Sequence, residues 1–291
     1  MATDLLNNFR SGDTDNNVLR KILSRLLTVS DSASGDFVNP EFAASRTGTV
    51  GGKTAYVFHV LGRRTGFNST SVLQDAAEFL GTSINAMPEL TGAENLEVVS
   101  ASTNDTEAGT GARTIQVTYI DTGGNLVTSA DIPLNGQTAV ALGFKSIQII
   151  WMVVTKVGSG DVSAGNVLLR IAGAGATHEQ ITAGGNRSMS SHFMVPAGYT
   201  AYLAEWHGSA VGTATQDARL RATVLPVSRA ISSTYLFQDT AFVAAGTEIS
   251  SNCPYLACPA LSKIKVSTIP SAAAAPNRLD SDYTVLLISN T

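Results

Sequence analysis

One tripeptide in the chain is spelled like a catalytic motif. Residues 118–126 read TYIDTGGNL, so two apolar residues precede an Asp-Thr-Gly, as in the catalytic loop of an aspartic protease. That chemistry needs two carboxylates about 3 Å apart that share one proton, and because the chain contains a single Asp-Thr-Gly, only a homodimer could assemble them. The alternative is a hairpin turn between strands 113–120 and 125–132, with positive φ angles at residues 123–125 and Asp121 hydrogen-bonded to the turn. The strand-like flanks favour the turn.

Two glycine-rich segments resemble catalytic loops but fail on spacing. RTGTVGGKT at 46–54 looks like a phosphate-binding loop, yet three residues instead of four separate its key glycines, and no apolar strand leads into it. VGSGDVSAGN at 157–166 places serines among glycines without the Gly-x-Ser-x-Gly spacing of a lipase-type nucleophile. We expect neither segment to carry catalysis.

The histidines offer no metal-binding pattern along the chain. No histidine stands two or four residues from another; they are His59, His178, His192 and His207. Strands can bring distant residues together, so a metal site that adds Glu179 or Glu205 stays an alternative. The sequence favours exposed or hydrogen-bonded histidines, and predicts no catalytic, cofactor-binding or metal-binding residues.

Three aromatic residues raise the possibility of carbohydrate binding. In VPAGYTAYLAEWHG, the rings of Tyr199, Tyr202 and Trp206 could stack on sugars. On a regular strand Tyr202 and Trp206 point to one side and Tyr199 to the other. We expect packing in the core, with carbohydrate contact as the alternative.

The composition favours a surface covered by small polar residues or by partner subunits. Charged residues make up 14% of the 291 residues, against roughly 25% in a typical soluble domain. The net charge of −4 argues against a nucleic-acid partner. The longest apolar stretch, residues 147–154, is shorter than the roughly 20 residues of a membrane helix, and we expect neither a membrane partner nor a cleaved signal peptide. Cys253 and Cys258 are too few for a disulfide scaffold, and whether they are bonded stays open.

Residues 1–93 are expected to form an N-terminal helix and an extended arm. The apolar residues of 18–27 recur in adjacent pairs four apart, which predicts an amphipathic helix. Capping-box spacing predicts a second, short helix over 72–80, and residues 32–54 between the two helices are rich in small and turn residues. The stripe through which the first helix would dock consists of Leu19, Ile22, Leu23 and Leu26.

From residue 94 onward the pattern is that of β-structure. Short segments rich in β-branched residues alternate with Gly, Asn, Asp or Pro turns, and no helix intervenes at the spacing of a parallel sheet. We predict an all-β fold, namely an antiparallel, jelly-roll-like β-sandwich over residues 94–291.

Several separate stretches of this region resemble β-rich virion structural proteins of tailed bacteriophages. The matching stretches are Thr110–Thr114, Leu134–Thr138, Gly158–Gly165, Val195–Tyr202 and a C-terminal pair, 261–269 and 281–288, that looks like the family's last hairpin. The resemblance covers about residues 94–291. It implies a jelly-roll-like protein on the particle, without enzymatic activity and without catalytic or cofactor-binding residues.

These observations predict a capsid decoration or cement protein, made in the host cytoplasm and located on the capsid surface of the virion. We expect it to bridge major capsid protein subunits and to form a homo-oligomer, with a trimer favoured. The stripe on the N-terminal helix would bury apolar surface across subunit junctions, at roughly 25 cal/mol per Å², or would instead pack on the sandwich of its own chain. The alternative function is a receptor-binding tail or head-fibre protein.

Overall fold

The computed structural model describes residues 45–50, 53–67, 70–81, 84–212, 216–222, 237–244, 246–252, 257–271 and 278–291. The predicted helix over 18–27, with Leu19, Ile22, Leu23 and Leu26, lies outside these residues, and so does Cys253. Within the described residues the chain is all β, with antiparallel strand pairing throughout, and its helical segment is the 3-10 helix η3 (Glu78–Leu80).

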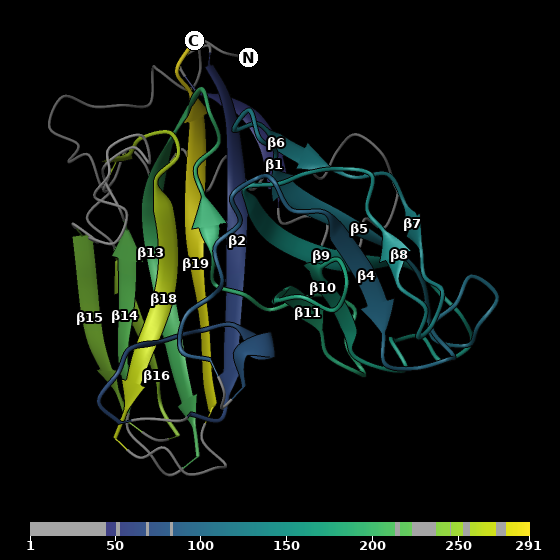
Figure 1. Ribbon diagram of the computed structural model, residues 1–291. Coiled ribbons are helices and arrows are strands. Elements are labelled where there is room, and N and C mark those ends of the chain that lie inside the picture. The colour runs from purple at the N-terminus through teal and green to yellow at the C-terminus, as the bar shows by residue number, and fades with distance from the viewer. Residues whose placement is uncertain are drawn as a thin grey trace, which may run out of the picture.

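The strands form two bodies, which lie on the left and the right of Figure 1. The larger one, called the main body below, consists of two sheets. The six-stranded sheet follows the order β1 (Ser45–Val50), β2 (Lys53–Thr65), β19 (Arg278–Ser289), β13 (Tyr199–Val211) and β16 (Glu248–Asn252), with β17 (Ala257–Cys258) also paired to β13. The five-stranded sheet follows the order β12 (Phe193–Met194), β18 (Lys263–Pro270), β14 (Gln216–Ala222) and β15 (Phe237–Val243), with β3 (Gln74–Asp75) paired to β18.

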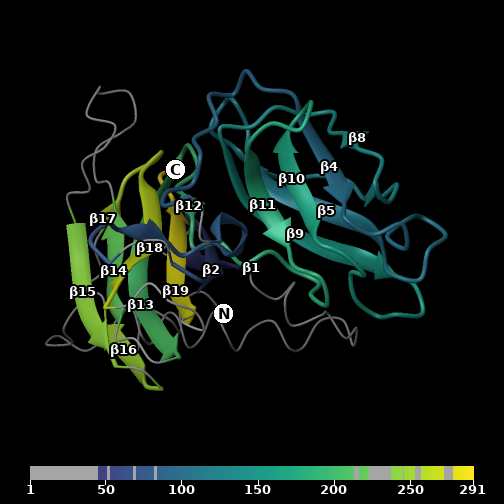
Figure 2. The ribbon, with the colours of Figure 1, turned by 60° about the horizontal axis from the view of Figure 1, so that its bottom comes forward.

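Strands β4 to β11 form the second body, called the inserted body. One of its sheets has the order β11 (Thr177–Ile181), β10 (Val167–Ile171), β4 (Leu96–Ser100) and β8 (Val140–Ala141). The other joins β6 (Leu126–Thr128), β7 (Ile132–Pro133) and β9 (Gln148–Val157) to β5 (Ala112–Ile120). The chain leaves the main body after β3 and returns to it at β12, so this body is an insertion, and Figure 2 shows it beside β2 and β19.

Each body has its own apolar core. Phe58, Trp206 and Tyr283 belong to the core of the main body, whereas Ile115 and Met152 belong to that of the inserted body. The main-body core also takes up two residues from the inserted body, Ile120 and Ile150. The two bodies therefore share packed apolar surface.

The prediction of one sandwich over residues 94–291, preceded by an arm, differs from this arrangement in two ways. The described part of the chain forms two bodies instead of one jelly-roll-like sandwich. Residues 45–50 and 53–65 are strands of the six-stranded sheet instead of an irregular arm. In β2 the apolar residues on both faces are buried, for example Val57 and Phe58, as expected for a strand covered on both sides.

Of the predicted helix over 72–80 only the end forms, as the 3-10 helix η3 before Gly81, because tertiary contacts override the local signal at Gln74 and Asp75. Gln74 and Asp75 instead form the short strand β3 and are buried. The guanidinium of Arg64 donates to Gln74 Oε1 over 3.0 Å, and Lys265 Nζ donates to Asp75 Oδ2 over 2.8 Å. This buried polar network holds β3, and with it the start of the outgoing link, residues 76–95, against the main body.

The C-terminal strand pair is also not the hairpin that the resemblance implied. β18 belongs to the five-stranded sheet and β19 to the six-stranded sheet. The two strands face each other across the core, where the Tyr283 hydroxyl donates to the Ile264 carbonyl over 3.2 Å. This placement buries the inward side chains of both strands against one another.

The buried carboxylate of Asp105 closes the loops at one end of the inserted body. It accepts four hydrogen bonds, from Ala112 N and Ala164 N (each 2.8 Å) to Oδ1 and from Ser100 Oγ (2.5 Å) and Gly165 N (2.9 Å) to Oδ2. A Cβ atom on Gly111 would lie 2.1 Å from Asp105 Oδ1, so this position has no room for a side chain. The stretches Thr110–Thr114 and Gly158–Gly165 meet at this carboxylate.

Candidate functional site

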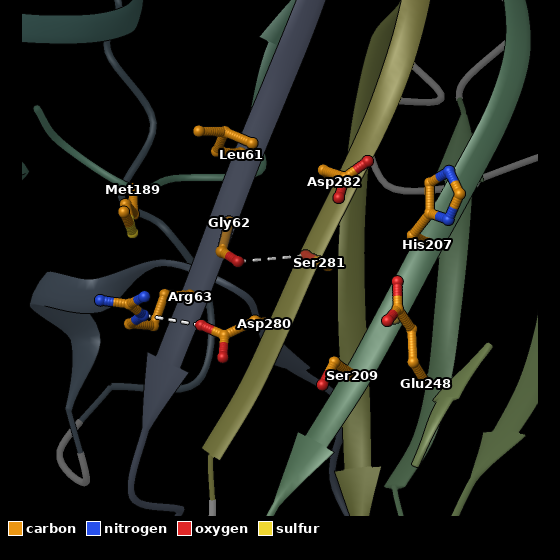
Figure 3. A pocket seen from close by; sticks show the side chains of 11 residues that line it. Leu61, Gly62, Arg63, Met189, His207, Ser209, Glu248, Asp280, Ser281 and Asp282 are labelled. Atoms are coloured by element: carbon orange, nitrogen blue, oxygen red, sulfur yellow. Dashed lines mark hydrogen bonds and ion pairs between the residues drawn. The ribbon is translucent and has the colours of Figure 1, made fainter. Parts of the chain in front are cut away.

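The outer face of the six-stranded sheet, which points away from the main-body core, has an apolar half and a polar half. The apolar half consists of Ala55, Val57, Tyr202, Leu286 and Ile288. The polar half gathers side chains from four neighbouring strands, namely His59, Arg63, Glu205, His207, Ser209, Glu248, Asp280, Asp282 and Thr284. Figure 3 shows most of these polar residues beside one another.

Strand register explains the gathering. Asp282 is the direct partner of His207 on β13 and of Leu61 on β2, while Asp280 is the partner of Ser209 and Arg63. Direct partners in an antiparallel pair place their side chains on the same face. With Met189 from the returning link they line a shallow depression of about 150 Å³.

Asp280 has a structural role in the depression. Arg63 Nε lies 2.6 Å from Asp280 Oδ1, and Arg278 Nε lies 2.8 Å from Oδ2. Arg63 also approaches Glu78 of η3 at 3.8 Å. Asp280 is therefore neutralised by two guanidinium groups and ties β19 to β2.

Asp282 is the electrostatically unusual carboxyl of the site. Burial raises the pKa of Asp282 most, His207 and His59 lower it, and Glu205 and Glu248 raise it further, so that the pKa ends above its ordinary value. Among the described residues, no Lys or Arg side chain forms an ion pair with Asp282. A half-buried carboxyl of this kind takes up a proton more readily than an exposed one.

The arrangement suits binding better than catalysis. Ser209, His207 and Asp282 are the residue types of a hydrolase triad, but within the described chain no hydrogen bond joins Ser209 to His207 or His207 to Asp282, and a triad needs both contacts. Nor do the described residues contain a group of three or more His, Cys, Asp or Glu side chains that could hold a metal ion. The depression can accept hydrogen bonds or a positively charged group from a partner.

The Asp-Thr-Gly motif forms the turn that the sequence favoured. β5 and β6 pair as a hairpin, with Ile120 opposite Leu126. Asp121 Oδ1 accepts hydrogen bonds from Gly123 N and Asn125 N, each of 2.8 Å, and the Asn125 backbone contributes most to lowering the pKa of Asp121. Positive φ angles were expected at residues 123–125, but of these only Gly124 has one, at 83°. Asp121 thus stabilises a turn.

The aromatic residues of β13 lie on other faces than predicted. Trp206 is fully buried in the main-body core, and Tyr199 packs beside the same core, 5.8 Å from the Tyr56 ring. Tyr202 lies on the outer face with the apolar half. Core packing is thus confirmed for Trp206. The predicted faces are wrong because the strand register shifts between Leu203 and Glu205, and an extra residue reverses the alternation of faces beyond it.

Sequence reasoning found part of this site and missed the rest. His59, His207 and Glu205, considered for a metal site, do come together on the outer face. His178, His192 and Glu179 lie elsewhere and are buried. Asp280 and Asp282 were not identified, although acids two residues apart in a β-strand pattern signal a shared polar face.

Comparisons with known proteins place the chain in no established family. No family model matches it, and no curated protein matches it. A particle structure of infectious bursal disease virus (IBDV) aligns with a TM-score of 0.23 and 12% identity, over 92% of this chain and 74% of that one. The Gt strain of the same virus gives 0.22 and 11%, over 92% and 76%. The tandem CBM22 domains of Xyn10C from Paenibacillus barcinonensis give 0.18 and 12%, over 81% and 87%. None of the helical segments within the described ranges is long and apolar enough to span a membrane.

Proposed function

We propose that the chain is a non-enzymatic structural protein of a tailed-phage virion and acts as a capsid decoration or cement protein. One observation carries the proposal: the stretches that resemble phage virion proteins form corners of the architecture. Thr110–Thr114 and Gly158–Gly165 meet at buried Asp105. In Val195–Tyr202, Val195 N donates to the Ser262 carbonyl over 2.9 Å. Residues with these roles support a rigid body.

A cement protein needs a rigid body and a means of reaching neighbouring subunits. In this proposal the two bodies provide rigidity, and the stripe of Leu19, Ile22, Leu23 and Leu26 docks on major capsid protein subunits. Apolar surface buried at such a junction contributes roughly 25 cal/mol per Å², less the cost of ordering the segment. The proposal includes a homotrimer on the capsid surface and a jelly-roll-like relationship to the phage proteins.

Labelling of particles tests the assignment directly. An antibody against residues 45–291 is expected to label the heads of intact particles of the virus that encodes the chain. A variant without residues 1–44 should remain folded and lose binding to undecorated capsids. The deletion stops there because β1 begins at Ser45 and pairs with β2, an interior strand of the sheet. Binding of the shortened chain as tight as that of the full chain would refute the docking stripe.

The oligomeric state is tested separately. A trimer of the 30.3 kDa chain should elute with a mass of about three times that value in light scattering. A monomer at micromolar concentration would contradict the trimer without touching the virion assignment.

A receptor-binding tail or head-fibre protein is the second candidate, favoured by the polar depression on the outer face. An adhesin needs a hydrogen-bonding surface for its receptor, and Asp282, His207 and Glu248 line such a surface. Antibody labelling of tails or fibres, together with specific binding on a glycan array, would support this candidate over the cement protein.

A further inference from the structure

Glu179 is a buried acid on the core side of the inserted body. It is the partner of Leu169 in the ladder between β11 and β10, and both residues are fully buried. Leu169 belongs to the apolar core, as does Ile181 two residues further along β11. A carboxyl therefore occupies a position where the alternation of β11 calls for an apolar side chain.

The returning link, residues 186–191, runs past this carboxyl and connects the two bodies. On one side it pairs with β9, since Ser188 N donates to Met152 O over 3.0 Å and Met152 N donates to Ser188 Oγ over 2.8 Å. On the other side it pairs with the outgoing link, where Glu78 N donates to Met189 O over 3.0 Å. The returning link is thus hydrogen-bonded on both sides.

The surroundings of Glu179 favour its neutral form. Burial raises the pKa of Glu179 to about 8, and the hydroxyls of Ser190 and Ser188 and the charge of Arg187 offset only part of this effect. Within the described part of the chain, neither carboxyl oxygen has a partner at full hydrogen-bond geometry. An ionised carboxylate in this place would be incompletely solvated.

Arg187 is the cation whose charge acts on Glu179, but its guanidinium contacts other groups. Successive side chains of an extended segment point to opposite sides, so the side chain of Arg187 points away from the side on which Ser188 lies. Its guanidinium lies 5.2 Å from the centre of the Trp151 ring and donates to the His59 carbonyl over 3.2 Å. Arg187 cannot neutralise Glu179 without leaving these contacts.

The other charged groups on the surrounding elements are engaged elsewhere. Each forms an ion pair with another residue: Lys156 of β9 with Asp131, Arg170 of β10 with Glu97, and Glu78 of η3 with Arg63. On β11 itself, burial lowers the pKa of His178 and so keeps its imidazole neutral. The negative charge of Glu179 is therefore removed by protonation and not by an ion pair.

We propose that Glu179 is a proton-dependent clasp for the returning link: the protonated carboxyl seats residues 186–191 between the two bodies, and a rise in pH loosens them. The open link exposes the carboxyl to water, where it ionises, so opening releases a proton. Loss of the proton thus favours an open link and weaker coupling between the bodies. The inference concerns the fold and does not depend on the virion assignment.

Hydrogen exchange of the full-length chain between pH 5 and 9 tests the clasp, after correction for the intrinsic pH dependence of exchange. Opening of the link releases one proton, so it becomes about tenfold more favourable per pH unit between the pKa of the carboxyl in the open link and its pKa in the closed link. The protection factors of the Ser188 and Glu78 amides should fall at that slope until about pH 8 and then level off. In Glu179→Gln, which keeps the shape of the neutral acid, the protection should be independent of pH.

Two controls separate the clasp from general unfolding. Glu97→Gln makes the same chemical change at a carboxyl whose pKa is lowered, with the Arg170 hydrogen bond as the main cause, and should retain the slope. The protection factors of the β19 amides should not show this dependence on pH. A flat wild-type profile at Ser188, or the same slope in Glu179→Gln, overturns the proposal, and the wild-type profile alone decides it if that variant fails to fold.

Discussion

Replacing Asp105 with Asn should destabilise the inserted body far more than the same change at an exposed turn. The carboxylate of Asp105 is fully buried and accepts two hydrogen bonds on each oxygen. An asparagine keeps one oxygen and turns an NH₂ group toward two of the four donors. Either orientation of the amide leaves at least one backbone N–H facing another donor, so the conflict cannot be relieved by a flip.

The size of the effect follows from the two bonds that are lost. A hydrogen bond to a charged group contributes about 1.5–3 kcal/mol, and an unmade buried one costs its desolvation. Two such losses amount to about 4 kcal/mol, a large share of the roughly 5–15 kcal/mol of a typical domain. Urea denaturation followed by the tryptophan fluorescence of the chain in which Trp206 is replaced by Phe, so that Trp151 on β9 of the inserted body is the reporter, measures the loss.

Asp121→Asn is the matched control. Asp121 also accepts hydrogen bonds from two backbone amides and from the Asn125 side chain. Its turn is solvent-exposed, so water can replace a lost partner, and we expect a loss below about 1 kcal/mol. If Asp105→Asn cost no more than Asp121→Asn, the assignment of Asp105 as the residue that closes the loops would be wrong.

Three further substitutions and one control substitution test the packing and the pH dependence. Arg64→Met should cost about 3–5 kcal/mol in urea denaturation, because it removes the buried hydrogen bonds that Arg64 donates to the Asp75 carbonyl and to Gln74 Oε1, and with them a cation near Asp75. Burial alone would raise the pKa of Asp75, but Lys265, His192 and Ser267 outweigh it, so the pKa is lowered. The stability that Asp75 contributes is therefore present above the pKa of Asp75 in the unfolded chain and is lost as the pH falls through its pKa in the folded chain. The melting temperature of Asp75→Asn should depend less on pH below 4 than that of the wild type. Gly111→Ala should cost about 1–3 kcal/mol by overpacking, whereas Gly143→Ala, with open space around the added carbon, should be neutral in the same assay.

The sequence predicted those features that depend on neighbouring residues. All-β structure, antiparallel pairing and the hairpin around Asp121 follow from alternation and turn residues, which act over a few positions. The face on which each residue of β13 lies did not follow, because the register shift after Leu203 leaves no local mark. The segment 72–80 was misassigned for a related reason, since the groups that hold Gln74 and Asp75 come from distant parts of the chain.

The candidate site depends even more on distant pairing. His207 and Asp282 are 75 positions apart in sequence but direct partners in the sheet. Their proximity is a property of strand order, which one sequence does not disclose. What the sequence does contain is the alternation of Asp280, Asp282 and Thr284 with the mostly apolar residues 279, 281, 283 and 285, and this pattern identifies the polar face without identifying its neighbours.

The insertion explains why buried ionisable groups of the strands lie against the two links. β2 and β19 come from opposite ends of the described chain, and Lys53 Nζ donates to the Asn290 carbonyl across 237 positions. Pairs of such sequence separation form slowly, so we expect the more local inserted body to fold first. The main body then closes only if both links leave and enter it in one geometry. Arg64 fixes the outgoing link through the carbonyls of Gly81 and Ile84, and Glu179 lies against the returning one. A buried polar group that costs free energy can be retained because it selects one arrangement of the chain. Arg64 and Glu179 lie at the two places where the chain passes between the bodies, and there one arrangement has to be selected.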